Sequence, residues 1–365
     1  MIYIFLPTNN VGGVENRFVE MWVSMQIYYT RKPKLVMSQT LYNLYQNTIY
    51  KSSISKYLEN VIFYEAPITN YNKFNIEVLK ILRRDKPRLV HFVYLFPIKT
   101  IFFPVKKIYT FPTSSIRFAG RNDKISLLST FILSVFNKCT IDVLDLEIFS
   151  LLQTYSRNIF NTPGSIINME NYSNPQHIKN TNNIVFLGRF VSIKQIDKFV
   201  RLIPEIISYL NNRNTEISIS ILGKGLLEEN IRESIKGFSK EIQNTIEIKY
   251  SDDPRNCLYK SKVILSLQKQ TNYPSKSLLE GIAAGCIPLV TNVGSTNKIA
   301  NKEFSYYVEE DFTAQEIGEQ LFSILNLKEE AFNKKSTIAK SYVSNRFNIS
   351  NSLNYFEKLY KKHYV

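Results

Sequence analysis

Two cations close together in the chain are the first candidates for chemistry. In the segment Phe186-Leu-Gly-Arg-Phe-Val-Ser-Ile-Lys194, Arg189 and Lys194 follow a short apolar run and precede an amphipathic stretch. The run predicts a strand and the stretch a helix, so both cations should lie where the strand ends and the helix begins. Cations beside the N–H groups of a helix start suit a diphosphate. Taken alone, however, such a pair more often marks solvated residues at the start of a helix.

The polar start of another predicted helix is the second candidate. Ser275, Lys276 and Ser277 can open this helix, and its first N–H groups would have no partner within it. Glu280 follows within about a turn, among apolar and small residues. Its carboxylate could accept hydrogen bonds from a ribose diol. The alternative is a glutamate that interacts favourably with the positive end of the helix dipole.

Glycines follow two of the predicted strands. Gly12 and Gly13 come soon after the first apolar run, and Gly223 and Gly225 follow a later one. Glycine lets the backbone approach a ligand closely at the carboxyl end of a strand, where open α/β sheets bind their ligands. Neither pair forms the G-x-G-x-x-G pattern of dinucleotide-binding folds, and each alone is as consistent with a tight turn.

Short apolar runs rich in β-branched residues alternate with helical patterns along the chain. Most of these runs are continuous, which is typical of strands covered on both faces in a parallel sheet. The alternation itself predicts βαβ units. The predicted strands are Ile2–Leu6, Lys34–Met37, Val61–Tyr64, Leu89–Leu95, Lys107–Phe111, Thr140–Leu144, Ile184–Leu187, Ile217–Leu222, Ile246–Tyr250, Val263–Leu267 and Ile287–Val290.

An asparagine-rich, polar stretch over residues 168–183 interrupts this alternation and is predicted to be an interdomain linker. We therefore expect an α/β chain of two Rossmann-like domains that face each other across a cleft, one at residues 1–167 and one at 184–348. Residues 349–365 carry an apolar helical stripe and must dock on another part of the chain. The stripe consists of Leu353, Phe356, Leu359 and Tyr360.

Composition narrows the partners and the compartment. The 365 residues include 46 Lys and Arg against 31 Asp and Glu, a net charge of +15. Residues 1–175 hold 20 basic and 11 acidic residues, hence +9, and the rest hold 26 and 20, hence +6. This charge favours nucleic acid, phosphorylated metabolites or an acidic membrane surface. No apolar run approaches the ~20 residues of a membrane span, and the start is typical of a strand rather than a signal peptide. We expect a cytoplasmic protein.

Metal chemistry finds no support in the spacing of the candidate ligands. The three cysteines are scattered and predicted to be buried structural residues. The three histidines are equally scattered, without metal-ligand spacing, and His91, within a strand-like run, is predicted to be structural. The chain has no D-x-D triplet. Asp252-Asp253 before Pro254 is typical of a turn, and Asp145-Leu-Glu147 lies far in sequence from the other candidate residues.

Together the four blocks resemble the retaining GT-B glycosyltransferases, specifically glycosyltransferase family 4, the glycosyl transferases group 1. Gly188-Arg189 with Lys194, then Gly223-Lys-Gly225, then the block around Glu280 come in the family's order and spacing. The similarity covers nearly the whole chain. It implies that the second domain binds a nucleotide-sugar donor, that the first binds the acceptor, and that the terminal helix crosses back to the first.

The resemblance also implies transfer of the sugar with retention, without a metal or other cofactor. Arg189, Lys194 and Glu280 would be the catalytic residues, the two cations on the donor pyrophosphate and Glu280 on the ribose. Cations and helix N–H groups can stabilise a departing nucleoside diphosphate as a metal would. The donor-binding positions would be Gly12, Gly13, Gly223, Asn272, Ser275, Lys276, Ser277 and Glu280.

Two positions depart from the family's pattern. Asn272 stands where the family often carries the first of two glutamates, and the segment Tyr109–Ile116 lacks the histidine that the family often places near the donor sugar. An amide can donate and accept hydrogen bonds but supplies no negative charge. We therefore expect Asn272 only to orient hydroxyl groups of the sugar.

The predicted function is transfer of a sugar to a glycan or a polyprenyl-diphosphate-linked glycan in the biosynthesis of bacterial surface polysaccharide, such as O-antigen, capsule or lipopolysaccharide. The basic first half fits an anionic membrane surface. Residues 125–136 could form an interfacial helix, but without interleaved cations a core helix is favoured. A nucleotide-sugar epimerase on the same fold, a non-catalytic sugar-binding protein and a nucleic-acid-binding protein remain alternatives. The basic cluster at residues 78–88 carries no nucleic-acid motif and is more typical of a solvated helix end.

Overall fold

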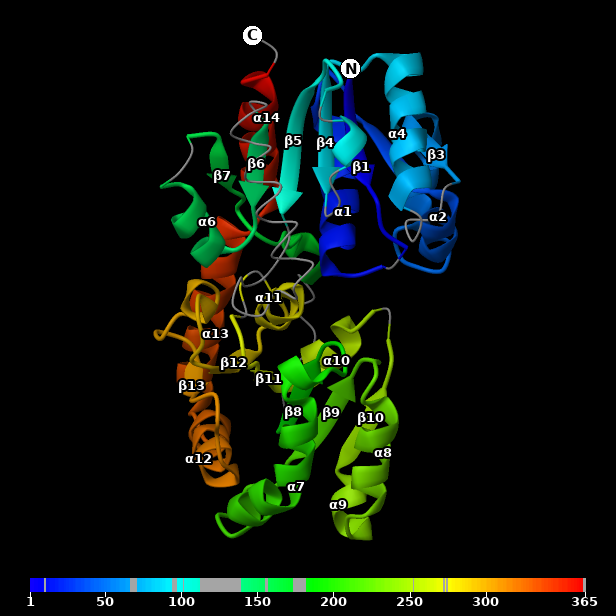
Figure 1. Ribbon diagram of the computed structural model, residues 1–365. Coiled ribbons are helices and arrows are strands. Elements are labelled where there is room, and N and C mark those ends of the chain that lie inside the picture. The colour runs from blue at the N-terminus through cyan, green and yellow to red at the C-terminus, as the bar shows by residue number, and fades with distance from the viewer. Residues whose placement is uncertain are drawn as a thin grey trace. The chain divides into compact units, whose positions relative to one another are not determined.

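The computed structural model describes residues 1–9, 11–65, 71–93, 97–100, 102–111, 139–154, 157–172, 182–251, 253–271, 273 and 275–363. The chain divides into two compact units (Figure 1): unit 1 comprises Met1–Ile166 with Ile349–Val365, and unit 2 comprises Ile167–Asn348. The segment 125–136, the end of Tyr109–Ile116 and residues 173–181 of the predicted linker lie outside the described residues.

Unit 1 is built on a parallel seven-stranded sheet in the order β3-β2-β1-β4-β5-β6-β7. New strands are added on one side of β1 up to β3 and on its other side from β4 onward, so the switch point lies between β1 and β4. The strands are β1 (Ile2–Leu6), β2 (Lys34–Ser38), β3 (Val61–Tyr64), β4 (Leu89–Val93), β5 (Lys106–Phe111), β6 (Thr140–Val143) and β7 (Ile159–Asn161).

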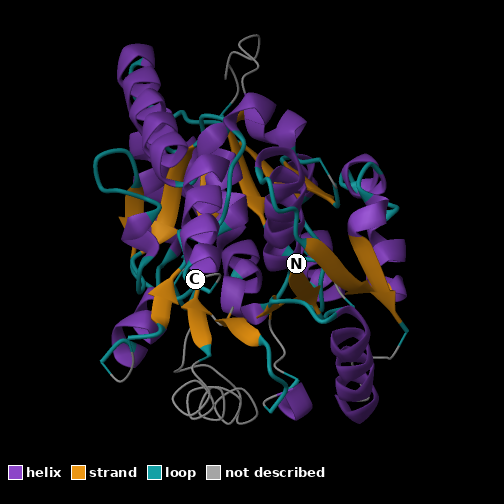
Figure 2. Cartoon of the chain, turned by 90° about the horizontal axis from the view of Figure 1, so that it is seen from above, coloured by secondary structure: helices purple, strands orange, loops and turns teal. Residues whose placement is uncertain are grey.

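Helices cover both faces of this sheet (Figure 2). Alternate residues of β1 enter two different cores: Ile2, Ile4 and Leu6 pack with α1 and α14, whereas Tyr3 and Phe5 pack with α4 and α6. This double burial explains why the strand is continuously apolar. The helices are α1 (Gly13–Tyr28), α2 (Gln39–Tyr45), α3 (Lys51–Ser55), α4 (Tyr71–Asp85), α6 (Leu146–Leu152) and α14 (Ile349–Lys361), with 3₁₀ turns η1 (Leu58–Asn60) and η2 (Ile98–Thr100).

The terminal helix α14 belongs to unit 1. The four residues of its predicted stripe are all buried in the core that α1 and β1 share. Polar contacts fix it further, because the Tyr355 hydroxyl donates to the buried carboxylate of Asp142. Thr110 Oγ1 donates to the other oxygen of that carboxylate at 2.6 Å. Burial raises the pKa of Asp142, although these hydrogen bonds and the charge of Arg17 favour its ionised form.

His91 joins the same polar network from β4. Its ring nitrogens lie 2.6 Å from Thr110 Oγ1 and 2.9 Å from the Tyr360 hydroxyl. Complete burial, followed by the charge of Arg17, lowers the pKa of His91 to about 3, so the ring is neutral. The prediction that His91 is a structural residue agrees with this position.

Unit 2 repeats the architecture with a parallel six-stranded sheet in the order β10-β9-β8-β11-β12-β13. Its switch point lies between β8 and β11. The strands are β8 (Asn183–Leu187), β9 (Ser218–Leu222), β10 (Ile246–Lys249), β11 (Ser261–Ser266), β12 (Ile287–Thr291) and β13 (Tyr306–Val308). The helices are α7 (Ile196–Asn211), α8 (Glu228–Lys236), α9 (Lys240–Asn244), α10 (Arg255–Lys260), α11 (Lys276–Ala283), α12 (Ala314–Leu325) and α13 (Glu329–Arg346), with 3₁₀ turns η3 (Met169–Tyr172), η4 (Ser192–Lys194) and η5 (Thr296–Lys298).

Local signals in the sequence account for several helix ends in unit 2. Thr313 and Glu316 form a capping box at the start of α12, with Thr313 N–H donating to Glu316 Oε2 at 2.7 Å. Helix α7 continues through Pro204 and buries one apolar face in the core. Within the described ranges of both units, no helix has the length and apolar character that crossing a bilayer requires.

Candidate functional site

The loop after β8 carries Arg189 and Lys194, and the loop after β9 holds it in place. Gly188 N–H donates to Leu222 O at 3.0 Å, and Phe190 N–H donates to Lys224 O at 3.0 Å. The 3₁₀ turn η4 ends at Lys194 and leads directly into α7. Both cations therefore lie at the carboxyl edge of the sheet, as the sequence predicts. The strand order shows that this place is beside the switch point.

Gly223 and Gly225 are required by the packing of these two loops. They have φ angles of +154° and +157°, which favour glycine. A Cβ on Gly223 would lie 1.9 Å from Gly188 O, and a Cβ on Gly225 would lie 2.6 Å from Phe190 O. The loop with Arg189 can reach its position only because these residues lack side chains. The other predicted glycines, Gly12 and Gly13, lie in unit 1 as the N-cap and first residue of α1.

Lys194 is electrostatically unusual. Burial, followed by the charge of Arg189, lowers the pKa of Lys194 to about 8. Among the described residues, neither cation makes a side-chain hydrogen bond or an ion pair with a carboxylate. Two neighbouring positive charges without such compensation favour an anion beside them, and a bound anion would raise the lysine pKa again.

Neighbouring segments hold Lys194 from both sides. Lys269 N–H, in the loop after β11, donates to Ile193 O at 3.0 Å. Gln195 adopts a left-handed conformation with φ +51°, and its Nε2 donates to Glu310 O at 2.9 Å. A non-glycine residue in this conformation is stabilised here by its own side-chain hydrogen bond. The lysine is thus positioned by contacts that do not involve its ammonium group.

The N-terminus of α11 lies at the same edge, in the connection that follows β11. Ser275 is its N-cap, with Oγ accepting from Leu278 N–H and lying 3.4 Å from Ser277 Oγ. The first i to i−4 bond runs from Leu279 N–H to Ser275 O, so the N–H groups of Lys276 and Ser277 precede the helical ladder. These groups are the predicted phosphate donors.

Close packing fixes α11 on its sheet. A Cβ on Gly281 would lie 2.7 Å from Ile264 Cγ1 of β11, so the helix can approach the strand only with glycine there. Glu280, the residue before, is partly buried. Asn272 and Pro274 lie outside the described residues, so the predicted contact of Asn272 with the donor sugar remains a prediction.

The loops after β11 and β12 are joined by side-chain hydroxyls. Thr291 Oγ1 donates to Gln268 O at 2.7 Å and accepts from Gln268 N–H at 2.9 Å. Thr271 Oγ1 accepts from Ser295 N–H at 3.0 Å and from Tyr273 N–H at 3.3 Å. The carboxyl edge of unit 2 is therefore a set of interlinked loops around the switch point.

Two residues at this edge were not predicted from the sequence. Lys224 Nζ lies 3.9 Å from the ring centroid of Tyr250, and the side chains of both residues are exposed. Lys224 follows β9 and Tyr250 follows β10, so sheet order brings them together. An aromatic residue directly after a strand was the available signal, but its partner is visible only once the strands are paired. The exposed ring offers a flat apolar face two strands from Arg189.

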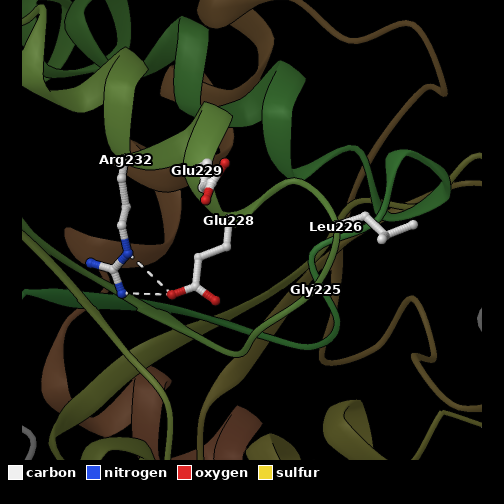
Figure 3. A pocket seen from close by; sticks show the side chains of 5 residues that line it. All are labelled: Gly225, Leu226, Glu228, Glu229 and Arg232. Atoms are coloured by element: carbon white, nitrogen blue, oxygen red, sulfur yellow. Dashed lines mark hydrogen bonds and ion pairs between the residues drawn. The ribbon is translucent and has the colours of Figure 1, made fainter.

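A surface pocket of about 400 Å³ opens beside this loop (Figure 3). Arg232 pairs with Glu228 there at 2.9 Å, and the acidic Glu229 also lines the pocket. Two carboxylates against one paired guanidinium disfavour a diphosphate. We therefore do not expect the diphosphate to bind in this pocket.

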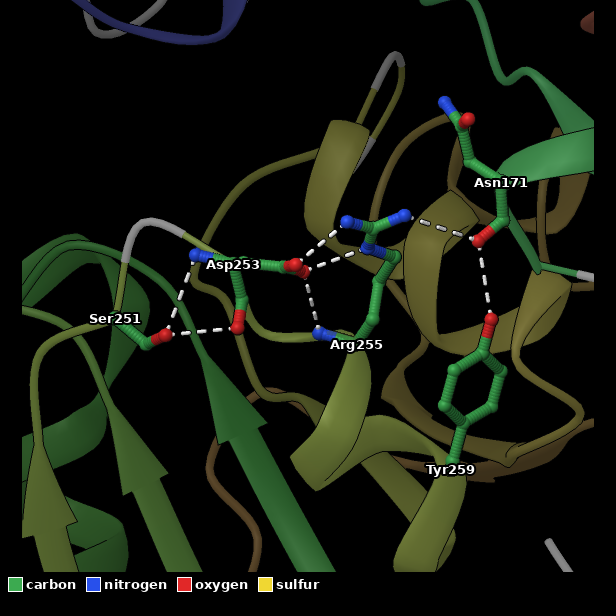
Figure 4. Close-up of polar contacts among 5 residues, drawn as sticks. All are labelled: Asn171, Ser251, Asp253, Arg255 and Tyr259. Carbon is green, nitrogen blue, oxygen red and sulfur yellow. Dashed lines mark hydrogen bonds and ion pairs between the residues drawn. The ribbon is translucent and has the colours of Figure 1, made fainter. Parts of the chain in front are cut away.

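The acidic residues considered for a metal site form hydrogen bonds and ion pairs with residues close to them in the chain. Asp253 forms a two-armed ion pair with Arg255 at 2.6 and 2.7 Å, and Ser251 Oγ accepts from its N–H (Figure 4). The hydrogen bond from Arg255 lowers the pKa of Asp253. Asp145 caps α6 through Ile148 N–H at 3.0 Å. Asp252 lies outside the described residues. Within the described part of the chain, no three His, Cys, Asp or Glu side chains gather as a metal site.

The same Figure 4 shows how the chain is tied down before β8. Asn171 O in η3 accepts from the Tyr259 hydroxyl at 3.0 Å and from Arg255 Nη1 at 3.5 Å. Both donors belong to α10, so the segment that leads out of unit 1 is anchored on unit 2.

Comparison with known proteins gives a family match over part of the chain and a fold match over the whole of it. Residues 168–340 match the model of the family described as Glycosyl transferases group 1. Among curated proteins, none matches the chain significantly.

Three solved structures resemble the whole chain. HepE from Anabaena, crystallised with UDP and glucose, has a TM-score of 0.75 at 10% identity, over 99% of both chains. Sucrose-phosphate synthase from Thermosynechococcus elongatus has a TM-score of 0.76 at 12% identity, over 100% of this chain and 98% of that one. WaaG, a glycosyltransferase involved in lipopolysaccharide biosynthesis, has a TM-score of 0.67 at 14% identity, over 96% and 97%. The chain has the GT-B fold of two Rossmann-like domains.

Proposed function

We propose that this protein is a group 1 glycosyltransferase that transfers a sugar from a nucleoside diphosphate sugar with retention of anomeric configuration. The observation that carries the proposal is the pair of Arg189 and Lys194 at the switch point of unit 2. The two cations are close enough for one to lower the pKa of the other. A donor diphosphate would supply the negative charge that the described residues do not.

The reaction places its charge where these groups lie. When the bond between the anomeric carbon and the diphosphate oxygen breaks, negative charge develops on that oxygen. An acceptor hydroxyl oxygen bonds to the carbon from the same face, and its proton passes to the departing diphosphate. Arg189, Lys194 and the N–H groups at the start of α11 would stabilise the departing diphosphate. Because fixed cations and dipoles do this in place, we propose that the reaction needs no metal ion.

The remaining donor contacts are proposed from the family resemblance, except those of Tyr250 and Lys224, which are proposed from the order of strands. Glu280 would accept hydrogen bonds from the ribose hydroxyls, and the Tyr250 ring would stack on the nucleobase, with Lys224 on its other side. From the resemblance alone, Gly13 is proposed to contact the donor phosphate. Asn272 would orient sugar hydroxyls.

The pathway and location extend the same proposal. We propose an acceptor that is a glycan or a polyprenyl-diphosphate-linked glycan, in surface-polysaccharide biosynthesis on the cytoplasmic face of the membrane. The likeness to WaaG, described for lipopolysaccharide, supports this pathway, and the basic first half of the chain supports the membrane contact. HepE was crystallised with UDP, so uridine nucleotides are the first to test.

Calorimetric titration with UDP, GDP and ADP tests the proposal. We expect one of them to bind, and Lys194→Ala to weaken it at least tenfold, because a charge-assisted contact is worth roughly 1.5–3 kcal/mol. Lys198→Ala is the matched control, since this lysine lies one turn further along and its ammonium stacks on Phe312 at 4.2 Å. Equal weakening by both variants, or no binding of any nucleotide, would refute the assignment. Transfer rather than epimerisation is then established by the products formed from the donor that binds.

A further inference from the structure

Cations gather at the amino edge of the sheet in unit 1, the edge opposite the strand ends at which such folds bind ligands. Arg88 directly precedes β4, and Lys106 is the first residue of β5. Lys34 opens β2, which lies beyond β1. The register pairs Leu89 with Lys106 and Tyr3 with Lys34, so the three residues lie at nearly one level. Neighbouring strands are about 4.8 Å apart, and the row therefore runs along the edge.

The ends of helices add further cations to this edge, because helices run antiparallel to the strands that they connect. Arg31 follows α1, Lys86 follows α4, and Lys362 follows α14. Figure 1 shows the start of the chain and the last turn of α14 at the tails of the β4 and β5 arrows. His363 at the end of α14 lies 2.9 Å from Thr140 Oγ1, at the first residue of β6.

Electrostatic coupling shows that these charges lie close together. Burial, followed by Arg88 and Arg31, lowers the pKa of the Met1 amino group. Burial, followed by Lys362 and Lys106, lowers the pKa of His363. Two of the nearby acids pair with cations, Asp85 with Arg84 and Glu357 with Lys361. A third, Glu59 before β3, accepts a hydrogen bond from Asn60 Nδ2 at 3.1 Å. We call the exposed group Arg31, Lys32, Lys86, Arg88, Lys106 and Lys362 the amino-edge surface.

Large apolar side chains are exposed close to these cations along the chain. Phe102, in the turn before β5, is 92% exposed, and Tyr28, the last residue of α1, is 70% exposed. Ile27 beside it is 58% exposed. Basic residues at helix ends are ordinary partners of the helix dipole, but dipoles do not explain exposed phenyl and aliphatic groups. Basic and apolar side chains together are typical of a surface that lies on a membrane.

We propose that the amino-edge surface docks on an anionic lipid bilayer, with Phe102, Tyr28 and Ile27 entering the headgroup region. Nucleic acid would satisfy the cations but would leave these apolar groups without a role, so the bilayer is the favoured partner. The proposal assigns a surface to the membrane contact of the proposed function, and it does not depend on donor binding. A bilayer at this edge leaves the opposite edge of the sheet, where Gly12 and Gly13 begin α1, open to the donor and to the glycan end of an acceptor that extends away from the membrane.

Co-sedimentation of the full chain with vesicles tests this docking. We expect binding to phosphatidylcholine vesicles that contain phosphatidylglycerol, loss of binding at high salt, and little binding to pure phosphatidylcholine. Each basic residue near such a surface contributes about fivefold, so the triple variant Arg31→Gln, Arg88→Gln, Lys106→Gln should bind about 100-fold more weakly. The matched control removes the same charge from exposed lysines of unit 2, in Lys236→Gln, Lys302→Gln, Lys334→Gln. It should retain binding within a few fold.

The apolar contribution has its own pair of variants. Phe102→Ser should weaken vesicle binding, whereas Leu226→Ser, which removes an equally exposed side chain from unit 2, should not. Thermal unfolding of each variant verifies that the fold is intact. Equal losses in the two charge variants, or no binding to anionic vesicles, would overturn the proposal. So would tighter binding to duplex DNA that the first triple variant abolishes. None of these readouts involves the donor, so a failure here leaves the transferase proposal untouched.

Discussion

Raising the pH from 7 to 9 should weaken nucleoside diphosphate binding about tenfold through Lys194 alone. The pKa of this lysine is lowered to about 8 by burial and by Arg189. Lys194 is then charged in roughly nine-tenths of the protein molecules at pH 7 and in roughly one-tenth at pH 9. The diphosphate binds the charged form and is itself fully ionised over this range, because its last pKa is near 6. The apparent association constant falls in proportion to the charged fraction.

Calorimetry in buffers of different ionisation enthalpy measures both the affinity and the protons exchanged. At pH 9 the bound diphosphate should restore the lysine charge, so binding should take up about one proton. Lys194→Arg is the control, because a guanidinium stays charged and should give a flat profile from pH 7 to 9. A flat profile for the wild-type protein, or an equal decline in Lys194→Arg, would refute the reasoning.

Three further outcomes follow from the structure. Gly223→Ala should lower the free energy of unfolding by about 2–4 kcal/mol, because its Cβ would meet Gly188 O at 1.9 Å. Gly12→Ala should cost under about 1 kcal/mol, because its backbone is extended and its Cβ would meet only the Glu15 carboxylate, at 3.0 Å. Equal costs in chemical denaturation would contradict this. Tyr355→Phe should lower the unfolding free energy by about 1–3 kcal/mol by leaving a buried carboxylate short of a donor, and an unchanged denaturation midpoint would contradict it. Asn272→Ala should lower turnover with little change in diphosphate affinity while Glu280→Ala weakens that affinity, and the reverse pattern would show that this block is misplaced.

Without a ligand, the protein should become more stable when Lys194 is replaced by an apolar residue. A lysine pKa below its ordinary value destabilises the folded state below about pH 8, and the penalty fades as the pH rises toward 10. Lys194→Met should therefore raise the unfolding free energy at pH 7, by about 1–2 kcal/mol because the side chain keeps some exposure. Thermal unfolding without ligand measures this, and a lower melting temperature for the variant would contradict it.

The sequence predicts the strands well where a strand is buried on both faces. The continuous apolar runs at β1, β4 and β12 are all buried in the structure. The two strands that were missed, β7 and β13, have three residues each and lie at sheet edges. So short a segment carries no periodicity, and its pairing with a neighbour decides its conformation.

The site was predictable where its residues are neighbours in the chain. Arg189 and Lys194 share one loop, and Ser275 caps a helix that starts at a recognisable polar cluster. The pair of Lys224 and Tyr250 could not be predicted, because it joins the ends of two strands. The sequence also does not explain why residue 223 is glycine. The atom that excludes a side chain there is the carbonyl oxygen of Gly188, which belongs to another loop.

Discrimination between a nucleoside diphosphate and its monophosphate tests the central claim most directly. The account holds that Arg189 and Lys194 bind the diphosphate group, so the wild-type protein should prefer the diphosphate by about 100-fold, from two charge-assisted contacts of roughly 1.5 kcal/mol each. Calorimetric affinities for the two nucleotides, measured with the wild type and with the Arg189→Ala, Lys194→Ala double variant, give the answer. The preference should collapse to a few fold in the variant. A preference that survives the double substitution would mean that the diphosphate is bound elsewhere.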